Sequence, residues 1–240
     1  MEKIINYLAI LGLVFVVGEG YINNPVASQS ILGYEPLRYE NIPNTGTTSG
    51  GDGSKTTGNR GDCPPTNKYF TALIPQNNGI NTLAEYPTLW FYSPYKQFTL
   101  NLVIEDKDSN NTVVNETYEI NQGEGIVGVT LPEDALGLEV NRTYNWRVYL
   151  TCDPLVEASA AAASGVIQRV TTDEYLITHS SIKERIRLYA KQGLWAEAIT
   201  TLIEARKFNP ADEELQQNWS DLLSDSDVLL EDFVSEPLVE

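Results

Sequence analysis

Three basic residues near the C-terminal end of the chain are spaced so that their side chains share one face of a helix. Lys183, Arg187 and Lys191 stand at positions i, i+4 and i+8, which lie above one another on an α-helix. A basic stripe of this kind attracts carboxylates, and residues 208–240 contain ten acidic residues and no lysine or arginine. The spacing therefore predicts a binding face for an oppositely charged partner or for the chain's own acidic tail. The alternative is a solvated helix face, because charged residues at this spacing are common on exposed helices.

The residues that catalysis would need are scarce. His179 is the only histidine, and no Gly-x-Ser-x-Gly or glycine-rich phosphate-binding motif accompanies it. Two cysteines and one histidine do not supply a convincing set of metal ligands. Residues 106–110 alternate as in a calcium loop, but Thr117 stands where such a loop needs its bidentate glutamate, so we expect a turn there. These observations predict a protein that is not an enzyme and that has no cofactor and no metal.

The composition is acidic and moderately hydrophobic. The 240 residues carry a formal net charge of −17 at pH 7, and 42% of them are hydrophobic. Nucleic-acid binding needs clustered lysine and arginine, and no such cluster here exceeds three residues, so a nucleic-acid partner is not expected. The length allows one large core or two small ones, and we expect two.

The first residues of the chain predict export. Lys3 precedes an apolar run, residues 8–17, which is shorter than the ~20 residues that span a bilayer as a helix. Small residues follow the run, so we expect a signal peptide over residues 1–28; an uncleaved membrane anchor is the alternative. Two cysteines of an exported protein pair by default, which predicts a disulfide between Cys63 and Cys152. The expected location is the periplasm, the cell envelope or the medium, with no stable membrane span after signal cleavage.

Alternating apolar residues predict a β-rich domain over residues 63–171. The expected strands are 69–74, 88–92, 98–105, 112–120, 127–131, 144–152 and 166–170. Seven short strands separated by turns are typical of an antiparallel sandwich of the immunoglobulin or fibronectin type III kind. Tyr144 follows Leu138 by six positions, as in the tyrosine corner of such domains, where the hydroxyl bonds a nearby backbone group.

The strand at 89–92 is apolar on both faces. This pattern predicts a central strand that is covered on both sides, and the helices that follow the sandwich would cover the second side. The alternative is that Trp90, Tyr92 and Tyr95 present flat rings to sugars, which would make the sandwich a glycan-binding module of the cell envelope.

Helical periodicity begins after residue 172. The expected helices are 185–192, 195–208 and 212–223, the second ended by the Asn209-Pro210 pair. The unit resembles a tetratricopeptide repeat, and the residues that carry the likeness are Tyr189, Gly193, Trp195, Ala198, Leu202, Ala205 and Pro210. The likeness implies a unit that binds other proteins in a groove lined by its first helix, and hence by the basic stripe. A single repeat cannot bury a core, so we expect it to dock on the sandwich.

Several longer segments resemble the cyanobacterial domain-of-unknown-function family 928. They read TALIPQNN at 71–78, TLAEYPTLWFY at 82–92, TCDP at 151–154 and IQRV at 167–170, and the likeness extends from about residue 61 to 223. Membership implies a signal peptide, a sandwich joined to helices and an exported cyanobacterial protein. It implies no activity, because the family has none assigned.

Together these features predict an α+β chain in five parts. They are a signal peptide (1–28), a disordered linker (29–62), the β-sandwich (63–171), helices that resemble a tetratricopeptide repeat and pack on it (172–224), and an acidic tail (225–240). The expected function is a non-enzymatic protein-binding or scaffold module whose partner is another envelope or exported protein. The alternative is the glycan-binding module.

Overall fold

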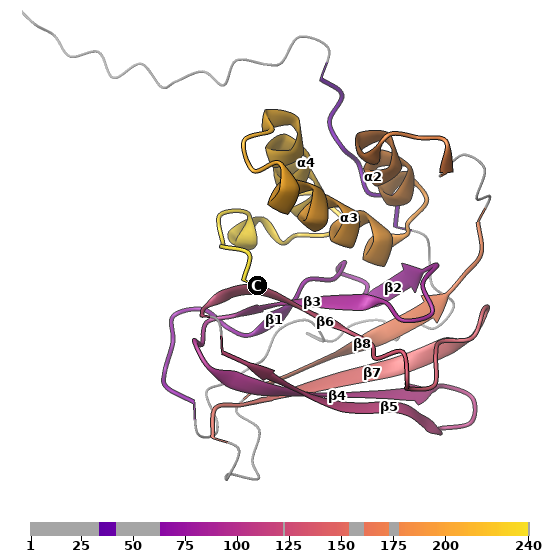
Figure 1. The fold of residues 1–240 in the computed structure, drawn as a ribbon, viewed down its shortest axis with the longest axis vertical. Coiled ribbons are helices and arrows are strands. Elements are labelled where there is room, and N and C mark those ends of the chain that lie inside the picture. Colours follow the sequence, from indigo (N-terminus) through magenta and orange to yellow (C-terminus); the bar gives the residue numbers. More distant parts are fainter. Residues whose placement is uncertain (1–33, 42–62, 122, 154–160, 173–177, 240) are drawn as a thin grey trace, which may run out of the picture. The chain divides into compact units, whose positions relative to one another are not determined.

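The computed structural model describes residues 34–41, 63–121, 123–153, 161–172 and 178–239 (Figure 1). The predicted signal peptide and most of the predicted linker lie outside these residues. The described strands and helices all belong to one compact unit, Pro36–Glu240. None of the described helices is long and apolar enough to cross a bilayer.

Eight strands form two sheets among the described residues. They are β1 (Thr71–Ala72), β2 (Gly79–Thr82), β3 (Thr88–Ser93), β4 (Phe98–Asp106), β5 (Thr112–Ile120), β6 (Gly125–Thr130), β7 (Thr143–Thr151) and β8 (Ala161–Arg169). One sheet has the order β1-β3-β6, and the other has the order β2-β8-β7-β4-β5. Every pair is antiparallel except β2 with β8, which is parallel.

The structure corrects the sequence interpretation at two strands. The periodicity does not predict β2, because its four residues are all buried and show no alternation of apolar and polar side chains. β8 begins at Ala161 rather than at Val166, since the small residues before Val166 lack the bulky side chains that indicate a strand. The parallel pairing of β2 also departs from the predicted wholly antiparallel sandwich.

The main core lies between the two sheets. Alternate residues of β4 and β7 point into it, as the burial of both strands shows. Phe91 of β3 contributes from the facing sheet, and its ring lies 6.1 Å from that of Trp146. Trp146 has room there because its register partner is Gly165, where an added Cβ would lie 2.7 Å from the indole.

Three α-helices follow the sandwich. They are α2 (Ile182–Lys191), α3 (Trp195–Phe208) and α4 (Glu213–Leu223), and a short 3-10 helix, η1 (Glu231–Phe233), comes after them. Ser181 and Glu184 form a capping box at the start of α2, and Gly193 takes a φ of 65° in the turn to α3. The Asp212 side chain caps α4 by accepting from two N–H groups of its first turn. These bounds agree with the predicted helices to within three residues.

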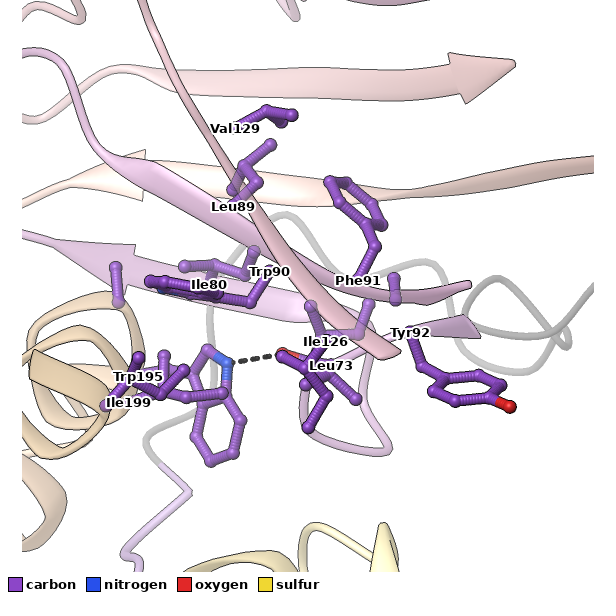
Figure 2. Packing of buried hydrophobic residues seen from close by; sticks show 14 of the residues in the cluster. Leu73, Ile80, Leu89, Trp90, Phe91, Tyr92, Ile126, Val129, Trp195 and Ile199 are labelled. Atoms are coloured by element: carbon purple, nitrogen blue, oxygen red, sulfur yellow. Dashed lines mark hydrogen bonds between the residues drawn. The ribbon is translucent and has the colours of Figure 1, made fainter. Parts of the chain in front are cut away.

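The helices lie over β3 of the three-stranded sheet, as the sequence predicts, and also over β2 of the other sheet (Figures 1 and 2). The indole N–H of Trp90 donates to the Thr200 hydroxyl of α3 at 2.9 Å. In the other direction, the indole of Trp195 donates to the carbonyl of Leu73 at 2.8 Å. β3 is therefore covered on both faces.

The C-terminal segment completes this layer. Phe233 of η1 lies with its ring 4.9 Å from that of Tyr92. Further along, Ile126 of β6 donates its N–H to Pro237 O and accepts from Val239 N, both at 2.8 Å. The end of the predicted acidic tail, residues 237–239, thus lies beside β6, and the described part of this tail belongs to the fold.

Candidate functional site

The basic stripe of α2 lies against α4. The Lys183 ammonium contacts Asp212 and Glu214 at 2.8 Å each, and Arg187 lies 3.6 Å from Glu214. Arg187 also donates to the Asn218 side chain at 3.1 Å. Two members of the predicted stripe therefore join α2 to α4, and both side chains remain partly exposed.

The side chains of these ion pairs keep their charges at physiological pH. The hydrogen bonds with Asp212 and Glu214 raise the pKa of Lys183, and the hydrogen bond from Lys183 lowers the pKa of Asp212. Both groups consequently stay charged across the physiological range. The third member, Lys191, is exposed in the last turn of α2.

An extended segment, residues 36–41, crosses the helical unit at the end of α2, and we call it the strap (indigo in Figure 1). Its backbone is held mostly by side-chain carboxylates. The N–H groups of Leu37, Tyr39 and Glu40 donate to Asp221 Oδ2 at 2.8 Å, Asp225 Oδ2 at 3.3 Å and Ala190 O at 3.0 Å, respectively. The acceptors come from α2, from α4 and from the turn after α4, and we call the surface on which they hold the strap the groove.

The strap's side chains alternate between the groove and the solvent. Leu37 and Tyr39 are buried, with 2% and 5% of their surface exposed, while Arg38 and Glu40 are exposed. The Tyr39 ring meets Trp195 edge to face, with ring centroids 5.2 Å apart. Leu37 and Tyr39 are therefore the apolar anchors of the strap, and burying a side chain such as Leu37 stabilises by roughly 1.5–3 kcal/mol.

Arg38 and Glu40 are both exposed, so the strap alternates strictly, with Leu37 and Tyr39 in the groove and the two charged side chains in solvent. This is the pattern of an extended chain with one covered face.

Carboxylates surround the second anchor. Burial raises the pKa of the Tyr39 hydroxyl, and the negative charges of Asp227 and Asp225 raise it further. The hydroxyl therefore stays protonated, and it donates to Gly193 O at 3.4 Å. An acidic groove of this kind disfavours an acidic ligand and favours a neutral or basic one.

The strap lies inside the segment for which the sequence predicts a linker, and sequence reasoning did not single it out. The signal that indicates it is short: Leu37 and Tyr39 alternate with two charged residues directly after Pro36. Four residues are too few to separate such a pattern from chance.

The aromatic residues proposed for sugar stacking are covered. Trp90, Tyr92 and Tyr95 expose 9%, 4% and 7% of their surface, so they form no open platform. Trp90 does line a pocket of about 320 Å³, whose other lining residues include Glu119 and Lys207.

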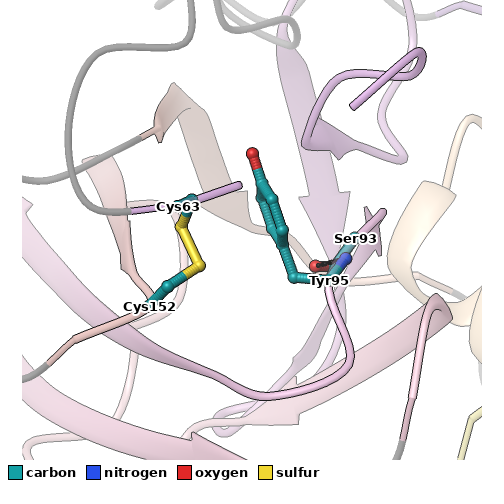
Figure 3. Close-up of a disulfide and its surroundings, with 4 residues drawn as sticks. All are labelled: Cys63, Ser93, Tyr95 and Cys152. Atoms are coloured by element: carbon teal, nitrogen blue, oxygen red, sulfur yellow. Dashed lines mark hydrogen bonds between the residues drawn. A yellow bond between two sulfur atoms is a disulfide. The ribbon is translucent and has the colours of Figure 1, made fainter. Parts of the chain in front are cut away.

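The cysteines lie together as predicted. Cys63 and Cys152 form a disulfide with their Cα atoms 5.1 Å apart (Figure 3). Tyr95 belongs to the same surroundings, and its N–H donates to the Ser93 hydroxyl at 3.2 Å. The bond ties the chain before β1 to the end of β7.

The side chains that the sequence offers for metal binding or acid-base chemistry do not form a reactive cluster among the described residues. Within the described residues, no three His, Cys, Asp or Glu side chains are grouped so that they could hold a metal ion. Asp106 closes its turn by accepting from the N–H and the hydroxyl of Ser109, and these bonds lower its pKa. His179 is exposed beside Thr178.

Comparison with known proteins gives one family match. The model described as Domain of Unknown Function (DUF928) matches residues 55–238. No curated protein matches the chain.

Proposed function

The chain belongs to the DUF928 family, and on that premise we propose that it is an exported, non-enzymatic protein-binding or scaffold module. Its ligand would be an extended segment of another envelope or exported protein, bound in the groove between α2 and α4. The observation that carries the proposal is the strap, because the groove already holds an extended peptide by its backbone and by two alternate side chains. Backbone bonds supply affinity in this mode of recognition, and the side-chain pockets supply specificity.

Two further features support the proposal. The helices resemble a tetratricopeptide repeat, a unit that commonly binds peptides along its first helix, and α2 takes that place here. The disulfide between Cys63 and Cys152 supports export, since such bonds persist in oxidising compartments.

Site-specific photo-crosslinking tests the proposal. Lys191 is exposed and directly follows Ala190, whose carbonyl holds the strap, so a crosslinking residue at position 191 reports on the groove. The matched control carries the same residue at Thr117, which is exposed on β5 of the other sheet. We expect a protein of the exported fraction to crosslink at 191 and not at 117. Equal crosslinking at the two positions, or none at 191, would count against a groove ligand.

Glycan binding is the second candidate function, and the observation that favours it is the pocket beside Trp90. The carboxylate of Glu119 and the ammonium of Lys207, which line this pocket with Trp90, can bind a small saccharide by hydrogen bonding. Calorimetric titration with envelope glycan fragments tests this, with Lys207→Ala as the variant and Lys191→Ala as its control. Loss of glycan binding in Lys207→Ala alone would favour this function. The same binding heat in the wild type and in both variants would exclude this pocket as the glycan site.

A further inference from the structure

We propose that the strap is a displaceable internal ligand, which closes the groove until an external segment of the same kind replaces it. The external segment would be extended and would carry two apolar side chains separated by one neutral or basic residue. This inference rests on the proposed function, because it assigns the groove to a protein ligand and then specifies the ligand's class and its regulation.

The backbone hydrogen bonds of the strap are of the kind that hold a bound peptide. Two of its three backbone bonds go to carboxylates, Asp221 and Asp225, and the third goes to the carbonyl of Ala190 near the end of a helix. None of these acceptors belongs to a strand of either sheet. Replacing the strap therefore exchanges its own contacts without breaking a β-ladder.

The residues that line the groove also make contacts that do not involve the strap. Trp195, which contacts Tyr39, is also fixed on its other side by its bond to the carbonyl of Leu73. α2 and α4 are joined by the ion pairs of Lys183 with Asp212 and Glu214, which do not involve the strap. The groove should therefore persist when the strap leaves it.

The charges restrict the ligand. Asp221, Asp225 and Asp227 give the groove an acidic side, and the strap's residue between its two anchors is the basic Arg38. An acidic residue at that position would be repelled, so we expect segments of the form apolar-x-aromatic with x neutral or basic.

The tether explains why the internal ligand dominates in the intact chain. Residues 42–62 connect the strap to Cys63 covalently, and a covalent connection of this kind gives an effective concentration on the order of millimolar. A free peptide at micromolar concentration competes poorly with a strap at this effective concentration. Cutting the tether should therefore raise the apparent affinity for a free peptide by about tenfold or more.

The test uses the full chain with a protease site substituted within residues 47–54. The probe is a fluorescent peptide of residues 34–41, and its anisotropy is followed with uncut and with cut protein at high dilution. We expect saturable binding to the cut protein, at least tenfold tighter than to the uncut protein. A peptide with Leu37→Ser and Tyr39→Ser is the matched control and should not bind.

A full-length variant with Leu37→Ser and Tyr39→Ser provides a second measurement, because its groove is intact and its strap lacks both anchors. It should bind the wild-type peptide without cleavage. Failure of the peptide to bind either folded protein would overturn the proposal. Loss of the folded state on cleavage, seen by circular dichroism, would overturn it as well, since the strap would then be part of the core. These outcomes use purified components, so they are distinct from the crosslinking result, which alone decides whether a partner exists.

Discussion

The hydroxyl of Tyr144 accepts a hydrogen bond from the N–H of Glu139 at 2.9 Å, which is the contact that the spacing from Leu138 predicts. Tyr144→Phe removes the acceptor and leaves the N–H without it. We expect the free energy of unfolding to fall by about 1–2 kcal/mol. Urea denaturation measures this, and Tyr149→Phe, at an exposed position of the same strand, is the control. Equal losses in the two variants would contradict a role for the corner bond.

Glu197 of α3 holds the loop after β2, because one carboxylate oxygen accepts from Thr82 Oγ1, Leu83 N and Ala84 N at 2.8, 2.7 and 3.2 Å. Burial raises its pKa above the ordinary 4.5, and the hydrogen bonds oppose this rise only in part. The contribution of this group to stability is therefore fully present below pH 4.5 and is lost as the pH rises through the folded-state pKa.

Glu197→Gln keeps an acceptor for the same N–H groups and cannot ionise. We expect the variant to gain stability relative to the wild type as the pH rises from about 4.5 towards neutrality. Urea denaturation at a series of pH values measures the difference. A difference that does not change with pH would show that burial does not penalise the charged form.

At the scale of elements, ion pairs join α2 to α4. Lys183→Glu removes two pairs and places a third carboxylate beside Asp212 and Glu214, whereas Lys191→Glu changes an exposed residue. We expect Lys183→Glu to lower the free energy of unfolding by at least about 1 kcal/mol more than Lys191→Glu. The gap should shrink in 1 M salt, where the Debye length is about 3 Å. Thermal unfolding at low and high salt checks this, and equal effects of the two reversals would mean that the stripe is a solvated face.

At the scale of the whole molecule, the disulfide joins positions 89 residues apart. In the chain-entropy model, closing a loop of that length stabilises the folded state by roughly 4 to 5 kcal/mol, less any native strain. We expect reduction to lower the unfolding midpoint clearly, measured by thermal denaturation with and without reductant. The variant with Cys63→Ser and Cys152→Ser should unfold at the reduced midpoint in both conditions. If reduction leaves the unfolding midpoint of the wild type unchanged, the disulfide does not stabilise the folded state.

Local patterns in the chain predict most of the elements. β4, β7 and the three helices follow from apolar residues at periods of two and 3.6, because the spacing of side chains along one element decides which face it can bury. The bond of Tyr144 and the pairing of Cys63 with Cys152 are also predicted, since a short spacing and a count of two leave few alternatives.

The candidate site depends on contacts that no local pattern contains. Leu37 and Asp221 are separated by 184 residues, and the carboxylate could as well have faced solvent. The same holds for Lys183, whose helix periodicity places it on a face without saying that Asp212 and Glu214 cover that face. Periodicity assigns a residue to one side of its own element, whereas the partner on that side is decided by which surfaces of the folded chain meet.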